Sequence, residues 1–147
     1  MRFITLAALF GAAAMAQPAR EDPTEKLFIS NYAISTTPNA FPTMSFRISA
    51  KNATHLVCAT GKYQYQDLMM NSFECPFPDG SSKYRFNVAR SNTERSGYKF
   101  SLAHELAPGF GVSAINVTIP TVCAAARPGY VTCVQNGPYV GKMTTLG

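Results

Sequence analysis

Apolar and polar residues alternate with a period of two along much of this chain, whereas a helix would require a period of 3.6 residues. In segments 43–50, 82–88 and 98–102 the apolar residues occupy every second position. Such a pattern is typical of β-strands with one face in a core and the other face in solvent. We therefore expect an all-β domain built from antiparallel strands.

Further segments follow the same rule less strictly, and turn-forming residues such as Pro128-Gly129 separate them. These segments are 27–34, 54–59, 62–66, 110–119, 130–134 and, more weakly, 140–144. The apolar positions change phase within 110–119, which predicts a β-bulge near Ala114. A compact antiparallel β-barrel and a β-sandwich both fit these strands, and closure into a barrel has the advantage that it removes exposed strand edges.

The N-terminal residues differ in character from the rest of the chain. Arg2 precedes an uncharged apolar run, and Ala14-Met15-Ala16 has the small residues that signal peptidase requires. The run is shorter than the roughly 20 apolar residues that span a bilayer, which disfavours a membrane anchor. We predict a signal peptide at residues 1–16, a flexible N-terminal arm at 17–26 and a single domain at 27–147. The protein is accordingly expected to be secreted, extracellular and not bound to a membrane.

Four cysteines indicate disulfides, because an even number in a small secreted chain is typical of an oxidising environment. They are Cys58, Cys75, Cys123 and Cys133. Three pairings are possible, and we favour the two local ones, which join residues that are near in sequence. A zinc site is disfavoured because no pair has the short C-x₂₋₄-C spacing of such sites. We expect neither a metal nor a cofactor.

The charge of the chain does not indicate a nucleic-acid partner. Removal of residues 1–16 takes away only Arg2 and leaves 12 basic against 8 acidic residues, a formal charge of +4. The basic residues are scattered singly, whereas a nucleic-acid binder normally concentrates them on one face. A mildly basic, soluble surface is the simpler interpretation.

Two frequent hydrolytic motifs are missing: the chain has no G-x-S-x-G elbow and no H-E-x-x-H pair. We therefore predict no catalytic residues and place both histidines, His55 and His104, at the surface or in turns. The alternative is a small ribonuclease-like hydrolase in which a histidine, a carboxylate and an arginine converge on a phosphate. Its carboxylate would come from Glu74, Glu94 or Glu105.

Some side chains are candidates for modification or for contact with a partner. Asn52-Ala53-Thr54 and Asn116-Val117-Thr118 are possible glycosylation sites. Tyrosines on disulfide-braced loops suit protein recognition. The candidate partner-binding residues are Lys62, Tyr63, Tyr65, Arg127, Tyr130 and Tyr139. A small apolar ligand inside the barrel is a third possibility, but the many large aromatics favour a filled core.

Several short segments, taken in order, resemble a known family. They are SFRISAKN at 45–52, LVC at 56–58, SFEC at 72–75, TIPTVC at 118–123 and VTCVQ at 131–135. This order is similar to that of the major Alternaria allergen family, a group of small secreted fungal proteins. The resemblance implies a compact β-barrel with the two local disulfides and a role without catalysis.

Members of that family act as allergens, elicitors or effectors, and some bind host defence proteins such as thaumatin-like proteins. In the allergen branch an additional N-terminal cysteine links two subunits. Because no cysteine precedes Cys58 in this chain, we expect a monomer rather than a covalent dimer. The resulting hypothesis is a secreted fungal effector or elicitor that binds an extracellular host protein and is not an enzyme.

Overall fold

The computed structural model describes residues 24–38, 40–61, 72–79, 83–89, 99–106 and 111–146. Outside these ranges lie the predicted signal peptide, residues 17–23 of the predicted arm and three candidate contact residues, Lys62, Tyr63 and Tyr65.

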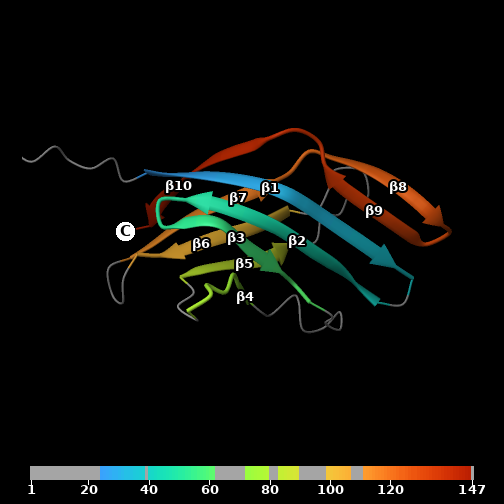
Figure 1. Cartoon of the computed structure of the whole chain (residues 1–147), viewed down its shortest axis with the longest axis horizontal. Coiled ribbons are helices and arrows are strands. Elements are labelled where there is room, and N and C mark those ends of the chain that lie inside the picture. The colour runs from blue at the N-terminus through green and yellow to red at the C-terminus, as the bar shows by residue number, and fades with distance from the viewer. Residues whose placement is uncertain are drawn as a thin grey trace, which may run out of the picture.

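The described residues form ten antiparallel strands and contain no helix (Figure 1). The strands are β1 (Thr24–Thr37), β2 (Ala40–Ala50), β3 (Ala53–Ala59), β4 (Phe73–Glu74), β5 (Tyr84–Ala89), β6 (Lys99–Glu105), β7 (Val112–Thr118), β8 (Thr121–Arg127), β9 (Tyr130–Gln135) and β10 (Tyr139–Leu146). No helix in this part of the chain has the length and apolar character needed to cross a membrane.

The strands curve into a nearly closed barrel. Neighbouring strands follow the order β3-β2-β1-β10-β7-β6-β5-β4. The two ends of this sheet meet where Cys58 on β3 is bonded to Cys75, the residue after β4, and both cysteines are fully buried. The second disulfide joins Cys123 and Cys133 across β8 and β9. The all-β class, the barrel alternative and both local pairings are thus confirmed.

Aromatic rings fill the barrel interior. Phe46 lies at their centre, with ring centroids 4.9 Å from Phe86 and 4.7 Å from Phe100. Tyr32 stacks on Phe100 at 6.0 Å. These rings come from four strands, whose side chains alternate inward and outward as the sequence predicts, except at residues 30–31 of β1. The core is therefore a packed aromatic cluster that holds the sheet in its curved form.

The β-bulge predicted near Ala114 is wrong. β7 pairs with β6 from Val112 to Thr118 without any register shift. The apparent change of phase arises because Ser113 is buried while the neighbouring Val112 is 37% exposed. Ser113 tolerates burial because its hydroxyl lies 3.2 Å from that of Thr145 on β10, within hydrogen-bond distance.

The predicted arm also extends too far. β1 begins at Thr24, and Thr24 to Lys26 pair with Thr144 to Lys142 of β10. The side chain of Glu25 is buried among polar partners, so this part of the chain is fixed in the barrel wall. The domain thus begins before residue 27.

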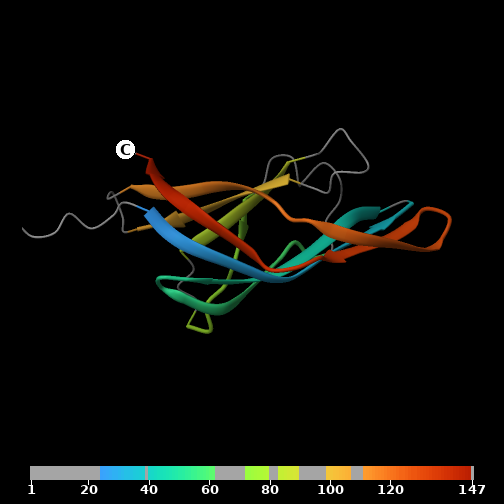
Figure 2. The same cartoon turned by 90° about the horizontal axis from the view of Figure 1, so that it is seen from above.

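β8 was not expected as a strand. Its residues after Thr121 are all exposed, and its Ala124-Ala125-Ala126 run lacks the alternation that marks a half-buried strand. It forms a hairpin with β9 that extends beyond the barrel, as Figures 1 and 2 show. β8 therefore owes its conformation to pairing with β9 and to the disulfide rather than to burial of a hydrophobic face.

Candidate partner-binding surface

Strand β1 changes its partner halfway along its length. Residues 24–29 pair with β10, whereas Ala33 to Thr36 pair with β9. Between them the pairing with β2 shifts from Ser30↔Arg47 to Ala33↔Ser45, which leaves Asn31 and Tyr32 opposite one residue. Asn31 has a φ of 55°, a left-handed conformation that asparagine adopts more readily than most residues. This bulge bends β1 and directs its second half along the hairpin.

Gln135 replaces the ladder bonds that are lost at this bend. Its Nε2 donates to the carbonyl oxygens of Ile29 and Gly137, each at 2.9 Å. Its Oε1 accepts the backbone N–H of Tyr32 at 3.1 Å. One side chain therefore joins β1, the end of β9 and the turn before β10, and fixes the hairpin relative to the barrel.

A second bulge lies nearby on β3. The pairing of β2 with β3 shifts between Ile48↔Leu56 and Ala50↔Ala53, and His55 has a φ of 51°. The backbone N–H of His55 donates to the Ser49 hydroxyl at 3.1 Å. The His55 side chain is exposed, as the sequence analysis predicted.

Both left-handed residues line one groove, which we call the bend groove. Its lining includes Phe28, Asn31, His55, Val134, Gln135 and Tyr139. Phe28 and Val134 are 48% and 50% exposed, so the groove presents apolar surface to solvent. Tyr139 is half-buried, and this burial raises the pKa of its hydroxyl. Backbone conformations that cost energy often mark functional sites, and here two of them shape the same hollow.

The hairpin continues this apolar surface. Val134 pairs directly with Val122, which is 56% exposed, so the two side chains share one face. Near the tip, the Arg127 guanidinium lies 3.7 Å from the centre of the Tyr130 ring, a cation–π contact that holds both side chains. The bend groove and the hairpin together place three predicted contact residues, Arg127, Tyr130 and Tyr139, on connected elements.

The outer edge of β8 is open among the described residues, where β8 pairs only with β9. Cys123 and Cys133 face one another with Cα atoms 3.9 Å apart, the close spacing of a pair that does not exchange backbone hydrogen bonds. Because the two kinds of pair alternate, the N–H and C=O groups of Thr121, Cys123 and Ala125 point away from β9. This edge can accept another extended chain.

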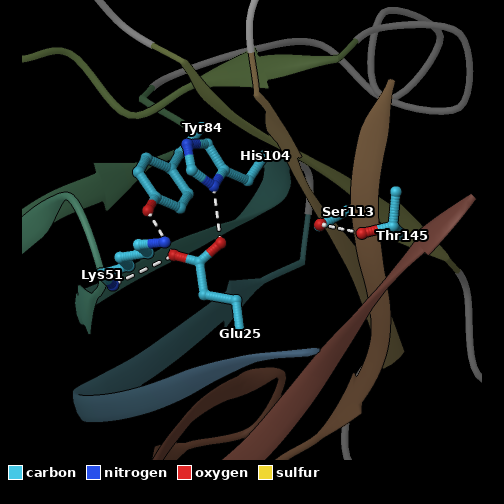
Figure 3. A network of polar contacts seen from close by, with 6 residues as sticks. All are labelled: Glu25, Lys51, Tyr84, His104, Ser113 and Thr145. Carbon is cyan, nitrogen blue, oxygen red and sulfur yellow. Dashed lines mark hydrogen bonds and ion pairs between the residues drawn. The ribbon is translucent and has the colours of Figure 1, made fainter. Parts of the chain in front are cut away.

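The expectation that both histidines lie at the surface is wrong for His104, which is only 1% exposed. Figure 3 shows its ring beside Tyr84 and Glu25. Its Nδ1 lies 2.6 Å from Glu25 Oε2, and its ring stacks on Tyr84 with centroids 4.1 Å apart. The other oxygen, Glu25 Oε1, accepts the Tyr84 hydroxyl at 2.8 Å and the Lys51 backbone N–H at 3.0 Å. Burial, followed by the hydrogen bond to Glu25, raises the pKa of Tyr84. The cluster ties β1, β5 and β6 together inside the wall.

This arrangement does not assemble the ribonuclease-like site. The carboxylate beside His104 is Glu25, which the sequence analysis assigned to the arm, and not Glu74 or Glu105. Glu74 instead pairs with Arg85 at 2.6 Å on the exposed face, and Glu94 lies outside the described residues. One signal could have identified Glu25: the inward positions Leu27 and Ile29 continue the same alternation back to residue 25.

The other predicted sites are placed as follows. Asn52 lies in the exposed turn between β2 and β3, and Asn116 is exposed on β7, so both side chains can be reached from solvent. Among the residues that the structure describes, no three His, Cys, Asp or Glu side chains gather in a way that could hold a metal ion.

Comparisons with known proteins agree with the fold and with the resemblance noted in the sequence. The chain is 31% identical to the effector protein PevD1 of Verticillium dahliae, over 90% of this chain and 85% of that protein. Two crystal structures of the major allergen Alt a 1 of Alternaria alternata match with TM-scores of 0.55 and 0.56. The first shares 16% identity with this chain, and the match covers 85% of this chain and 94% of the allergen. The second shares 18% identity, and the match covers 91% of this chain and 95% of the allergen. Residues 29–138 match the family model described as Alternaria alternata allergen 1, and the chain belongs to this family.

Proposed function

We propose that this chain is a secreted effector that binds an extracellular host protein and has no catalytic activity. Membership of the family and the 31% identity to an effector protein support this role. The partner is a host defence protein, with a thaumatin-like protein as the first candidate. The protein acts as a monomer after removal of residues 1–16, and Asn52 and Asn116 are its glycosylation sites.

The observation that carries the proposal is the hairpin β8–β9, which extends from the barrel with an open edge and an exposed Val122–Val134 pair. A projecting element with this exposure contributes little to the core, so its apolar surface is better explained by contact with another protein. The anchoring of its base by Gln135 keeps the surface preorganised, which reduces the entropy lost on binding.

The contacts of the partner are expected at the bend groove and along the hairpin. We keep Arg127, Tyr130 and Tyr139 in the set. We add Phe28, Val122 and Val134 because their apolar side chains are exposed. Arg127 and Tyr130 combine a cation with an aromatic ring, the residue types that dominate many binding surfaces. Lys62, Tyr63 and Tyr65 stay predictions from the sequence.

The experiment is capture of proteins from plant apoplastic fluid on the immobilised mature protein. Val134→Ser and Tyr130→Ala should each reduce the captured partner about tenfold or more, as expected at central contact positions. Lys99→Ala, at the exposed first position of β6, is the matched control and should capture as wild type does. Equal capture by all variants, or loss only in proteins that are unfolded by circular dichroism, would contradict the proposed surface.

The non-catalytic part of the proposal has its own test. Purified protein is incubated with RNA beside a His55→Ala/His104→Phe double variant. Cleavage by the wild type that disappears in the double variant would restore the hydrolase alternative. No turnover by either protein is the expected result, because His104 is buried and already bonded to Glu25.

A further inference from the structure

A second hollow lies on the outer face of the barrel, toward the N-terminal end of β1, and three lysines line it. Lys26 on β1, Lys142 on β10 and Lys51 in the turn between β2 and β3 are all exposed. Phe28 and Ser49 contribute to both this hollow and the bend groove. We call this site the lysine hollow.

Two of these lysines have an unfavourable placement. Lys26 and Lys142 are direct cross-strand partners, so their side chains emerge on the same face of the sheet. Like charges directly opposite each other destabilise a sheet, and an acidic residue at either position would instead stabilise it. Folding alone therefore gives no reason for this pair.

The described lining forms no ion pair with Lys26 or Lys142. Its only carboxylate belongs to Glu25, which is buried and accepts hydrogen bonds from Tyr84 and the Lys51 backbone while contacting His104. The remaining polar groups are the hydroxyls of Thr24, Ser49 and Thr54. The hollow thus combines cationic groups, neutral hydroxyls and one aromatic ring, that of Phe28, which is 48% exposed.

We propose that the lysine hollow binds a carboxylate-bearing sugar chain, that is, a uronic-acid oligosaccharide. The ammonium groups of Lys26 and Lys142 would pair with carboxylates, and the hydroxyls would bond to sugar hydroxyls. The Phe28 ring offers an apolar surface to the C–H face of a sugar ring. A free phosphate would use the charges and the hydroxyls but not the ring, and an acidic peptide would not need the row of hydroxyls. This site goes beyond the proposed protein contact and lies beside it.

The test titrates the mature protein with a galacturonic-acid oligomer and follows binding by calorimetry. The fully methyl-esterified oligomer has the same sugars without charge, while inorganic phosphate and an oligoglutamate peptide have charge without the sugar. Only the acidic oligomer should bind. Lys26→Gln/Lys142→Gln should weaken its binding by roughly tenfold or more, since hydrogen bonds between charged groups are among the strongest.

The control is Lys83→Gln/Lys99→Gln, which removes the same charge at two exposed lysines outside the hollow. It should bind the oligomer as wild type does. Without ligand, Lys142→Gln alone should raise the melting temperature because it relieves the repulsion of Lys26, and it should leave capture of the protein partner unchanged. Absence of binding, equal binding of the esterified oligomer, phosphate or oligoglutamate, or equal loss in the control would each overturn the proposal.

Discussion

The side chain of Gln135 supplies the hydrogen-bond partner that Tyr32 loses at the β1 bulge. The backbone N–H of Tyr32 donates to Gln135 Oε1 at 3.1 Å, and the same amide donates back to β1 through the carbonyl of Ile29. A side chain thus substitutes for the backbone of a neighbouring strand at the point where β1 passes from β10 to β9. This relationship connects the barrel to the surface proposed for partner binding.

Replacement of Gln135 should therefore loosen both the fold and the hairpin. Gln135→Leu keeps the volume but leaves the Tyr32 N–H and the Ile29 carbonyl without this partner, at a cost of about 1–3 kcal/mol in the free energy of unfolding. Urea unfolding measures the loss. Asn136→Ala, which removes the exposed side chain of the next residue, is the control and should change stability by less than about 0.5 kcal/mol. Equal effects of the two substitutions would contradict the bridging role.

The Glu25–Tyr84 contact predicts a dependence of stability on alkaline pH. Burial, followed by the hydrogen bond to Glu25, raises the pKa of Tyr84 in the folded protein. A raised pKa favours the neutral phenol in the fold, so its stabilising effect is complete below the unfolded-state pKa of about 10. The effect is lost as the pH rises from there through the higher folded-state pKa.

Tyr84→Phe isolates this effect. The variant should be less stable at neutral pH by about 1.5–3 kcal/mol, because it loses a hydrogen bond to a charged group. Its stability should then fall less steeply than that of the wild type above about pH 10. Urea midpoints from about pH 8 to pH 11 give the two slopes. Parallel curves for wild type and variant would exclude Tyr84 as the source of the alkaline loss.

Strict alternation made the barrel wall predictable from the sequence. Phe46, Phe86 and Phe100 each lie between two polar residues of their strand. This alternation identifies the face of each strand that points into the barrel. The disulfides were predictable because each pair is close in sequence. The bulge at Asn31 was not predicted. The inward positions change from odd at Ile29 to even at Tyr32, but apolar Phe28 and Ala33 occupy the outward positions and obscure this change of phase.

The candidate site was predictable only in part. Arg127, Tyr130 and Tyr139 could be chosen by residue type, but the elements that carry them depend on pairings that are distant in sequence. Gln135 acts on β1 across more than a hundred residues, and no local pattern marks that contact. Ser113 and His104 show the same limit, because polar side chains at inward positions are recognised only once their partners on other strands are known.

The two disulfides should differ in their resistance to reduction. Cys58 and Cys75 are fully buried, whereas Cys123 is exposed on the hairpin. Thiol–disulfide exchange requires access to a sulfur atom, so Cys123–Cys133 should be reduced first under native conditions. Timed alkylation followed by peptide mass spectrometry measures the order. Simultaneous reduction of both bonds would show that reduction proceeds through global unfolding instead.

The open edge of β8 can be tested by two proline substitutions that differ by one position. The N–H of Ala124 points toward β9, so Ala124→Pro removes a ladder hydrogen bond and should accelerate amide exchange at Thr132, its partner. The N–H of Ala125 points away from β9, and the residue before a proline prefers the extended backbone that Ala124 already has. Ala125→Pro should therefore leave exchange at Thr132 and the melting temperature close to those of the wild type.

Ala125→Pro nevertheless removes a hydrogen-bond donor from the open edge of β8. The substitution should therefore weaken only the binding of a partner that adds a strand at this edge. If the host protein docks in this way, the variant should lose capture from apoplastic fluid while remaining folded. Ala125→Ser, which restores the N–H and keeps a small side chain, should recover it. Capture that is unaffected by Ala125→Pro but lost with Val134→Ser would assign the contact to the bend groove and the outer face of the hairpin rather than to its edge.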